Sequence, residues 1–125
     1  MARIVIVEDD SLVAMGMRLY LESRGHEVLA VAATGQNAVD VAVDRGPDLV
    51  LMDVRLKGKM DGVEAAQRIL ARRVLPIVFV SGSSEPQTLD RMRSVGPAGM
   101  LLKPVTPSDL AAEVERVMAL GVTAH

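Results

Sequence analysis

The chain has 125 residues, no cysteine, and 14 basic against 16 acidic side chains, which gives a net charge of −2. This length predicts one domain over residues 1–125, with no separate output domain and enough interior to fold without disulfides. The lack of cysteine excludes disulfides and thiolate metal sites and fits a reducing cytoplasm. Since no basic run offers a footprint for phosphates, we expect no nucleic-acid binding.

The apolar segments of the chain are short. The longest, Val28–Ala33 and Val74–Val80, fall far below the roughly 20 residues of a membrane-spanning helix. The segment Ile4–Val7 is likewise too short for the core of a signal peptide. We therefore expect no membrane insertion and a cytoplasmic location.

Short apolar segments alternate with longer amphipathic segments along the chain. The short segments lack polar alternation, as strands buried on both faces do. They predict strands at Arg3–Val7, Val28–Ala33, Asp48–Met52, Pro76–Val80 and Gly99–Leu102. The amphipathic segments predict helices near Ser11–Ser23, Gln36–Asp44, Gly62–Arg72, Pro86–Val95 and Ser108–Leu120, with a frayed end at Gly121–His125. Five such units with right-handed crossovers predict a doubly wound, flavodoxin-like α/β fold with a parallel sheet of order 2-1-3-4-5.

Charged or hydroxyl side chains stand at the ends of four of these strands. Glu8 and Asp9 follow the first strand, Asp53 the third, Ser81 the fourth and Lys103 the fifth. In a parallel sheet of this order the carboxyl ends of the strands share one edge, where ligands bind at the switch point. The sequence therefore predicts one cleft in which these side chains meet.

Three carboxylates in one cleft favour a bound cation. Like charges about 4 Å apart repel by about 4 kcal/mol at an effective dielectric constant near 20. The side-chain ligands of Glu8, Asp9 and Asp53 are all oxygens, which favours Mg²⁺, or Mn²⁺, over Zn²⁺. Lys103 supplies a second positive charge. For Asp10 we favour a structural role, as the N-cap of the first helix.

Five short stretches contain these residues and their neighbours: "RIVIVEDD", "PDLVLMDVRL", "MDGVEAA", "PIVFVSG" and "LLKP". With them the whole chain resembles the receiver domain of two-component response regulators. Each stretch alone is a weak motif, whereas five in order at fitting spacing are specific. The resemblance implies a phospho-accepting receiver that takes its phosphoryl group from a histidine kinase or a histidine phosphotransfer protein. It then implies phosphorylation-dependent binding of an unknown downstream protein, or phosphoryl relay, by a monomer or weak dimer.

The resemblance also implies roles for the acidic residues of the cleft. Asp53 would be the residue that is phosphorylated. Asp9 and Asp53 would bind Mg²⁺ directly, and Glu8 would do so through water. The backbone carbonyl of Arg55 would complete the protein ligands.

The remaining cleft residues would act on the phosphoryl group. Ser81 would donate a hydrogen bond to it, and Lys103 would pair with it. In this family the peptide bond before the residue matching Pro104 is usually cis, which would aim Lys103 at the site. Such a domain catalyses only its own aspartyl phosphorylation and dephosphorylation, so we do not expect an enzyme in the ordinary sense.

Two departures from the family pattern concern the output. Many relatives have an aromatic residue that swings inward on phosphorylation as the residue matching Ser81 moves, and this chain has Met100 instead. The segment after Asp53 is one residue longer than the common form and contains Lys57 and Lys59. We therefore expect the readout to depend more on the loops beside Asp53 and Ser81 than on the fourth and fifth helices.

Two other classes of protein fit the sequence less well. A small Mg²⁺-dependent phosphotransferase or phosphatase with an aspartyl-phosphate intermediate usually has a second acid two residues after its nucleophile, where this chain has Arg55. A flavodoxin-type cofactor binder would need a phosphate loop after the first strand, and Glu8-Asp9-Asp10 would repel the phosphate there. Only Tyr20 and Phe79 are available as aromatic side chains for stacking on a cofactor.

Overall fold

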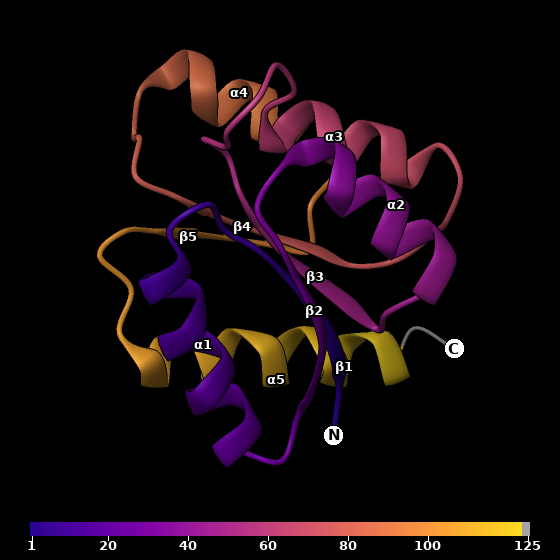
Figure 1. Cartoon of the computed structure of the whole chain (residues 1–125), viewed down its shortest axis with the longest axis vertical. Coiled ribbons are helices and arrows are strands. Elements are labelled where there is room, and N and C mark those ends of the chain that lie inside the picture. The colour runs from indigo at the N-terminus through magenta and orange to yellow at the C-terminus, as the bar shows by residue number, and fades with distance from the viewer. Residues whose placement is uncertain (124–125) are drawn as a thin grey trace.

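Five strands alternate with five helices along the chain (Figure 1). The computed structural model describes residues 1–123, with side chains as far as Leu120. The strands are β1 (Arg3–Val7), β2 (Glu27–Ala32), β3 (Leu49–Asp53), β4 (Ile77–Ser81) and β5 (Gly99–Leu102). The helices are α1 (Ser11–Ser23), α2 (Gly35–Arg45), α3 (Gly62–Leu70), α4 (Pro86–Ser94) and α5 (Pro107–Thr123).

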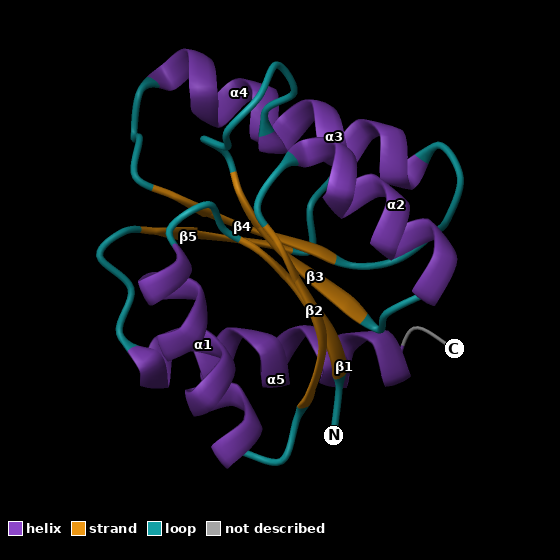
Figure 2. Ribbon diagram, in the orientation of Figure 1, coloured by secondary structure: helices purple, strands orange, loops and turns teal. Residues whose placement is uncertain are grey.

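The strands form one parallel sheet of order β2-β1-β3-β4-β5, so the predicted fold class and strand order are confirmed. Figure 2 shows this sheet between two layers of helices, with α2, α3 and α4 on one face and α1 and α5 on the other. On β1, Val5 and Val7 belong to the core under the first layer, whereas Ile4 and Ile6 belong to the core under the second. Because helices cover both faces, the central strands are apolar on both.

Two strands extend one residue further than predicted. β3 ends at Asp53 and β4 ends at Ser81, whereas the apolar pattern predicted ends at Met52 and Val80. In the parallel ladder Asp53 lies opposite Val80, and Ser81 lies opposite Leu102. Backbone pairing therefore fixes the positions of two of the predicted cleft residues.

The last helix is longer than predicted. α5 begins at Pro107, which suits a first helical turn because no backbone N–H is needed there. It continues to Thr123, so residues 121–123 of the predicted frayed end are helical, and residues 124–125 lie outside the described residues. Over the part of the chain that the structure describes, no helix combines the length and the apolar character needed to cross a bilayer.

Side chains cap four of the five helices. The capping residues are Asp10 for α1, Thr34 for α2, Asp61 for α3 and Thr106 for α5. The predicted cap at Asp10 is thereby confirmed. α4 begins after Glu85 without a side-chain cap, and Met92 is its only buried residue. α4 is thus the helix with the fewest fully buried side chains and has no side-chain cap, both of which would stabilise it.

The first residue of α3 lies directly against the end of β3. The N–H of Gly62 donates a hydrogen bond of 2.7 Å to the carbonyl oxygen of Val54. A Cβ atom at position 62 would collide with the backbone carbonyl of Asp53. Glycine at this position therefore lets α3 start against the peptide of Asp53 and holds that peptide in place.

Substitution of Gly62 by alanine is expected to lower the free energy of unfolding by about 1–3 kcal/mol, because the new methyl group would overpack a rigid backbone contact. Urea unfolding followed by circular dichroism measures the change in a protein without tryptophan. Gly16→Ala on α1 is the matched control, since a Cβ there meets nothing within 4 Å. The control should gain about 0.5–1 kcal/mol from helix propensity. Equal stability of Gly62→Ala and wild type would contradict the close approach.

Candidate functional site

The carboxyl ends of β1, β3 and β4 and the residue after β5 meet at one edge of the sheet. They line a cavity of about 680 Å³. The predicted cleft residues Glu8, Asp9, Asp53, Ser81 and Lys103 all contribute to its wall. The structure thus brings together side chains that are spread over most of the chain.

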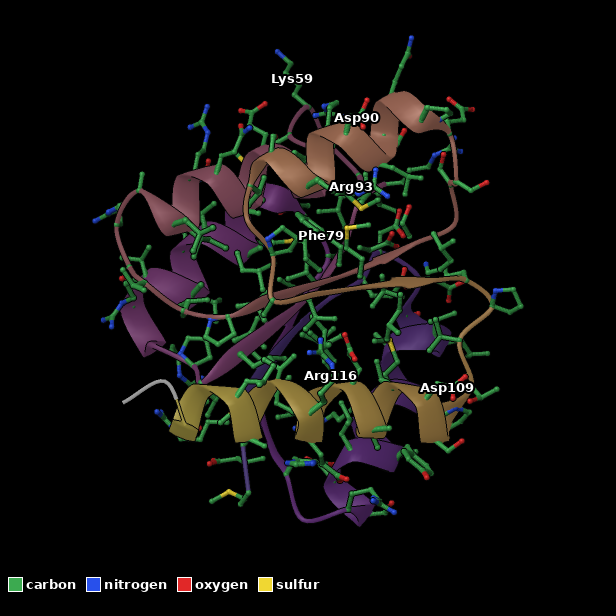
Figure 3. The ribbon with its side chains drawn as sticks, turned by 180° about the vertical axis from the view of Figure 1, so that it is seen from behind. Lys59, Phe79, Asp90, Arg93, Asp109 and Arg116 are labelled. Carbon is green, nitrogen blue, oxygen red and sulfur yellow. The ribbon has the colours of Figure 1, made fainter. Side chains whose placement is uncertain are left out.

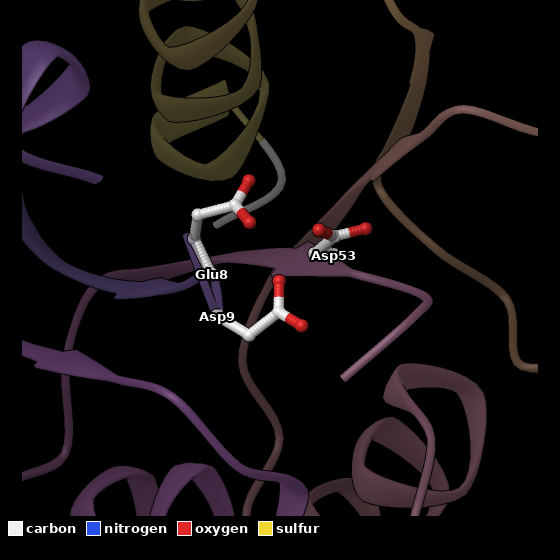
Figure 4. Close-up of side chains that lie close together, drawn as sticks. All are labelled: Glu8, Asp9 and Asp53. Atoms are coloured by element: carbon white, nitrogen blue, oxygen red, sulfur yellow. The ribbon is translucent and has the colours of Figure 1, made fainter. Parts of the chain in front are cut away.

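Three carboxylates gather in this cavity. Figure 4 shows Glu8, Asp9 and Asp53 directed toward a common point, and one oxygen from each lies within 4.8 Å of the others. Glu8 and Asp53 are buried, being only 4% and 6% exposed, whereas Asp9 is half-buried. The Oε2 atom of Glu8 accepts a hydrogen bond of 3.1 Å from the N–H of Asp10. The start of α1 therefore fixes the orientation of Glu8.

The ammonium group of Lys103 pairs with two of these carboxylates. Its Nζ lies 3.0 Å from Oδ2 of Asp53 and 3.1 Å from Oε1 of Glu8. Burial alone would lower the pKa of Lys103, but hydrogen bonds to Asp53 and Glu8 and the charges of both outweigh it and raise this pKa above its ordinary value. Lys103 is therefore charged at neutral pH and is held toward Asp53.

The donor set fits a hard divalent cation. Three carboxylates face one ammonium group, so the acidic group carries two more negative charges than its paired lysine balances when all three acids are ionised. All side-chain ligands are oxygens, as Mg²⁺ and Mn²⁺ prefer. Arg55, whose backbone carbonyl the family pattern implies as a further ligand, also lines this cavity.

The hydroxyl of Ser81 is buried at the end of β4. It donates to the carbonyl of Ser83 at 3.3 Å and accepts from the N–H of Ser83 at 3.1 Å. The backbone N–H of Lys103 donates to the carbonyl of Ser81 at 2.7 Å, which joins the two strand ends. The peptide bond between Lys103 and Pro104 is cis. Ser81 is thus placed in the cavity wall with its hydroxyl turned to its own loop.

Met100 lies in the position that the sequence linked to the output. It is half-buried on β5, lies opposite Phe79 in the ladder, and packs against the core under α2, α3 and α4. The loop between β3 and α3 is tied instead to the start of α2, through a parallel bridge between Thr34 and Lys57. Figure 3 shows Lys59 projecting outward from this loop.

Some polar residues of the cavity wall were not predicted as site residues from the sequence. Asp61, Thr88 and Arg91 also line the cavity. The Asp61-Gly62 pair does signal the start of a helix, but the ion pair of Asp61 with Arg91 of α4 joins residues that are 30 positions apart. Amphipathic periodicity gives no sign of such a contact, because Asp61 precedes α3 as its cap and Arg91 is on the exposed side of α4.

A doubly wound five-stranded sheet with three acids, a serine and a lysine at its carboxyl edge is the architecture of a phospho-accepting regulatory domain. The chain belongs to the response regulator receiver domains, because residues 4–115 match the family model described as "Response regulator receiver domain". This membership places it in two-component signalling and does not favour the phosphotransferase or cofactor-binding alternatives.

Curated relatives and solved structures agree with this assignment. The chain is 37% identical over 113 residues to the transcriptional regulatory protein PdtaR of Mycobacterium tuberculosis, and the match covers 90% of this chain and 55% of PdtaR. It is 29% identical over 116 residues to the phyllosphere-induced regulator PhyR of Methylorubrum extorquens, with 92% and 43% covered. The chain therefore spans about half the length of these relatives.

Among solved structures, the signal receiver domain of a modulated diguanylate cyclase from Desulfovibrio desulfuricans G20 superposes with a TM-score of 0.92 at 38% identity. The match covers 100% of this chain and 99% of that one. A CheY-like receiver domain protein from Methanospirillum hungatei JF-1 gives a TM-score of 0.93 at 24% identity, with 100% and 99% covered. At that identity the second likeness shows the fold alone.

Replacement of Lys103 by methionine is expected to lower the free energy of unfolding at neutral pH by about 1–3 kcal/mol, because buried carboxylates lose their charged partner. The raised pKa of Lys103 in the folded state fixes the pH dependence. The contribution of Lys103 to the free energy of unfolding is complete below the ordinary lysine pKa of about 10.4. It is lost as the pH rises through the higher pKa of the folded state. The difference between wild type and variant should therefore be constant near neutral pH and shrink in strong alkali.

Urea unfolding at a series of pH values measures this difference. Lys57→Met is the matched control, because Lys57 is exposed and forms no ion pair among the described residues. The control should leave stability nearly unchanged at every pH. A Lys103→Met variant as stable as the control at neutral pH would show that the pairing contributes nothing to the fold.

Proposed function

We propose that this receiver domain accepts a phosphoryl group on Asp53 from a histidine kinase or a histidine phosphotransfer protein. The observation that carries the proposal is the buried carboxylate of Asp53, with one oxygen 3.0 Å from the Nζ of Lys103. The same carboxylate belongs to an acidic group that suits a divalent cation. Burial, a fixed cation and a cation site are what a carboxylate nucleophile needs for phosphoryl transfer.

In the transfer, a carboxylate oxygen of Asp53 forms a bond to phosphorus while the bond from phosphorus to the donor's histidine nitrogen breaks. The leaving nitrogen keeps the electron pair of that bond. Lys103, already beside Asp53, stabilises the negative charge on the transferred group. The hydroxyl of Ser81 would exchange its hydrogen bond to Ser83 for one to a phosphoryl oxygen.

A divalent cation belongs to this proposal. Mg²⁺, or Mn²⁺, would be held by Asp9 and Asp53 directly, by Glu8 through water and by the backbone carbonyl of Arg55, and when bound it neutralises charge on the transferred group. Glu8 is well suited to an indirect role, because both of its oxygens already have partners in Lys103 and the N–H of Asp10.

Incubation with acetyl phosphate and Mg²⁺ should add one hydroxylamine-sensitive phosphoryl group, detectable as a shift in intact mass. Asp53→Ala should abolish the shift, because the nucleophilic oxygen is gone. Asp44→Asn, which removes an exposed carboxylate on α2, is the control and should be labelled like wild type. Labelling of Asp53→Ala to the wild-type extent would overturn the assignment of Asp53.

We further propose where the phosphodonor docks. Three large apolar side chains of α1 are exposed on one stripe of the helix: Leu12, Met15 and Leu19 are 77%, 59% and 62% exposed. Beside it lies a second cavity of about 620 Å³, which shares Val13 and Lys103 with the Asp53 cavity. The donor's histidine must come within bonding distance of Asp53, so its docking surface has to adjoin the Asp53 cavity. An apolar helical surface of the donor would cover this side of α1.

Leu12→Asp should slow phosphotransfer from a purified histidine kinase or phosphotransfer protein that phosphorylates the wild type, by about tenfold or more, because a charge would be placed in an apolar contact. Labelling by acetyl phosphate should stay unchanged. An acidic residue in the first turn of a helix is favourable, so the variant is expected to fold. Val74→Asp is the control, since Val74 is fully exposed in the loop between α3 and β4. Equal slowing by both variants would contradict docking on α1.

The output is expected to run through the loops around Asp53 and Ser81. Methionine has flexible torsions and no ring to lock inward or outward, so Met100 makes a weak switch. The loop after Asp53 carries the exposed cations Lys57 and Lys59 and is bridged to the start of α2. These contacts support a downstream partner that reads this loop. Amide chemical shifts on addition of beryllofluoride would contradict the proposal if the largest remote changes ran through Met100 into both α4 and α5.

A further inference from the structure

An arginine from α4 reaches the wall of the Asp53 cavity. Arg91 lines this cavity, and its Nη2 lies 2.8 Å from Oδ2 of Asp61. The other carboxylate oxygen of Asp61, Oδ1, accepts the N–H of Glu64 at 2.9 Å as the cap of α3. Asp61 therefore binds two helices at once, one with each oxygen.

The contact with Asp61 matters because α4 has few other attachments. Met92 is its only buried residue, and no side chain caps its first turn. The second ion pair on this helix, between Arg93 and Asp90, is internal to α4 (Figure 3). Among the ion pairs of residues 1–123, the one between Arg91 and Asp61 is the one that joins α4 to another element.

We propose that Arg91 is a phosphoryl-binding residue that changes partner on phosphorylation. Its guanidinium leaves the carboxylate of Asp61 and pairs with the phosphoryl group on Asp53. The inference rests on the proposed phosphorylation of Asp53. It adds a second cationic side chain next to the phosphoryl group, from a helix that contributes none of the residues given a role above.

The chemistry of the two partners favours this exchange. A carboxylate offers one negative charge, whereas a phosphoryl group carries about 1.5–2 and three acceptor oxygens. The planar guanidinium of arginine binds such a group through two parallel hydrogen bonds. With a divalent cation bound, Lys103 and that cation supply three positive charges, whereas Glu8, Asp9 and the phosphoryl group together carry nearly four negative charges, so one further cationic side chain is accommodated. Arg91 is about half exposed, so its guanidinium has room to turn.

The exchange would move α4 without disturbing α3. Asp61 keeps its capping bond to Glu64 when Arg91 leaves, because the two contacts use different oxygens. The last turn of α4, which carries Arg91, would be drawn toward the cavity. Met100 takes no part in this route, so the missing aromatic ring does not prevent α4 from responding.

The affinity of beryllofluoride at fixed Mg²⁺, taken from its half-saturating concentration, tests the proposal. Arg91→Gln should weaken binding by about three- to tenfold, because the measured loss is only the excess of the pairing with the phosphoryl mimic over the pairing with Asp61. Asp61→Asn should strengthen binding, because Arg91 no longer has to leave a carboxylate, and asparagine caps a helix as well as aspartate does. If the ion pair only held α4 in place, Asp61→Asn would weaken beryllofluoride binding, because it would loosen α4 just as Arg91→Gln does.

The double variant separates the exchange from simple charge removal. In the Arg91→Gln background, Asp61→Asn should no longer strengthen binding. Strengthening of the same size in both backgrounds would mean that Asp61 acts only as a nearby negative charge, and would overturn the proposal. Arg93→Gln, on the same helix and paired with Asp90, is the control and should leave the affinity unchanged.

A spectroscopic measurement follows Arg91 directly. The Nε–H signal of Arg91, identified by its loss in Arg91→Gln, should shift on addition of beryllofluoride, whereas the signal of Arg93 should not. An unmoved Arg91 signal in protein that gains a phosphoryl group on Asp53 from acetyl phosphate would overturn this inference and leave the proposed function standing. Failure of wild type to gain that group would overturn the proposed function itself.

Discussion

One ammonium group between two buried carboxylates organises this molecule. Lys103 reaches Glu8, 95 positions earlier, and Asp53, 50 positions earlier. Buried charges are tolerated only when they are paired. Removal of one partner leaves the other charge buried and uncompensated, which destabilises the folded state. The ends of β1, β3 and β5 must therefore come together, because only then does Lys103 neutralise the buried carboxylates of Glu8 and Asp53. The requirement that stabilises the sheet edge is the same one that places a nucleophile beside a cation.

Backbone contacts then set the position of that nucleophile. Asp53 is the last residue of a central strand, paired with β4 on one side, and α3 begins against its peptide through Gly62. A side chain on a loop would be positioned less well than one anchored in this way. By contrast, the hydroxyl of Ser81 bonds only to its own loop, so it can turn without breaking the sheet. The site combines a fixed carboxylate with a movable hydroxyl.

Local patterns in the sequence were enough for the five strands, their order and the convergence of acids, serine and lysine, because buried parallel strands have an unmistakable apolar character. The same patterns stopped β3 and β4 one residue short. An apolar run ends before a polar residue, whereas the ladder continues through Asp53 and Ser81 because their backbones still have partners. Arg91 was missed for a related reason. Its relation to Asp61 depends on how α4 lies across α3, and no periodicity within either helix encodes it.

The second cavity, an open groove beside α1, contains a natural spectroscopic probe. The chain has no tryptophan and a single tyrosine, Tyr20, which lines that groove with its ring half-buried. Tyrosine emission from the unlabelled protein therefore comes from one ring at one place. A binding partner without tyrosine or tryptophan that covers the groove would change the surroundings of this ring, so the native chain carries its own optical probe of the surface next to the phosphorylation cavity.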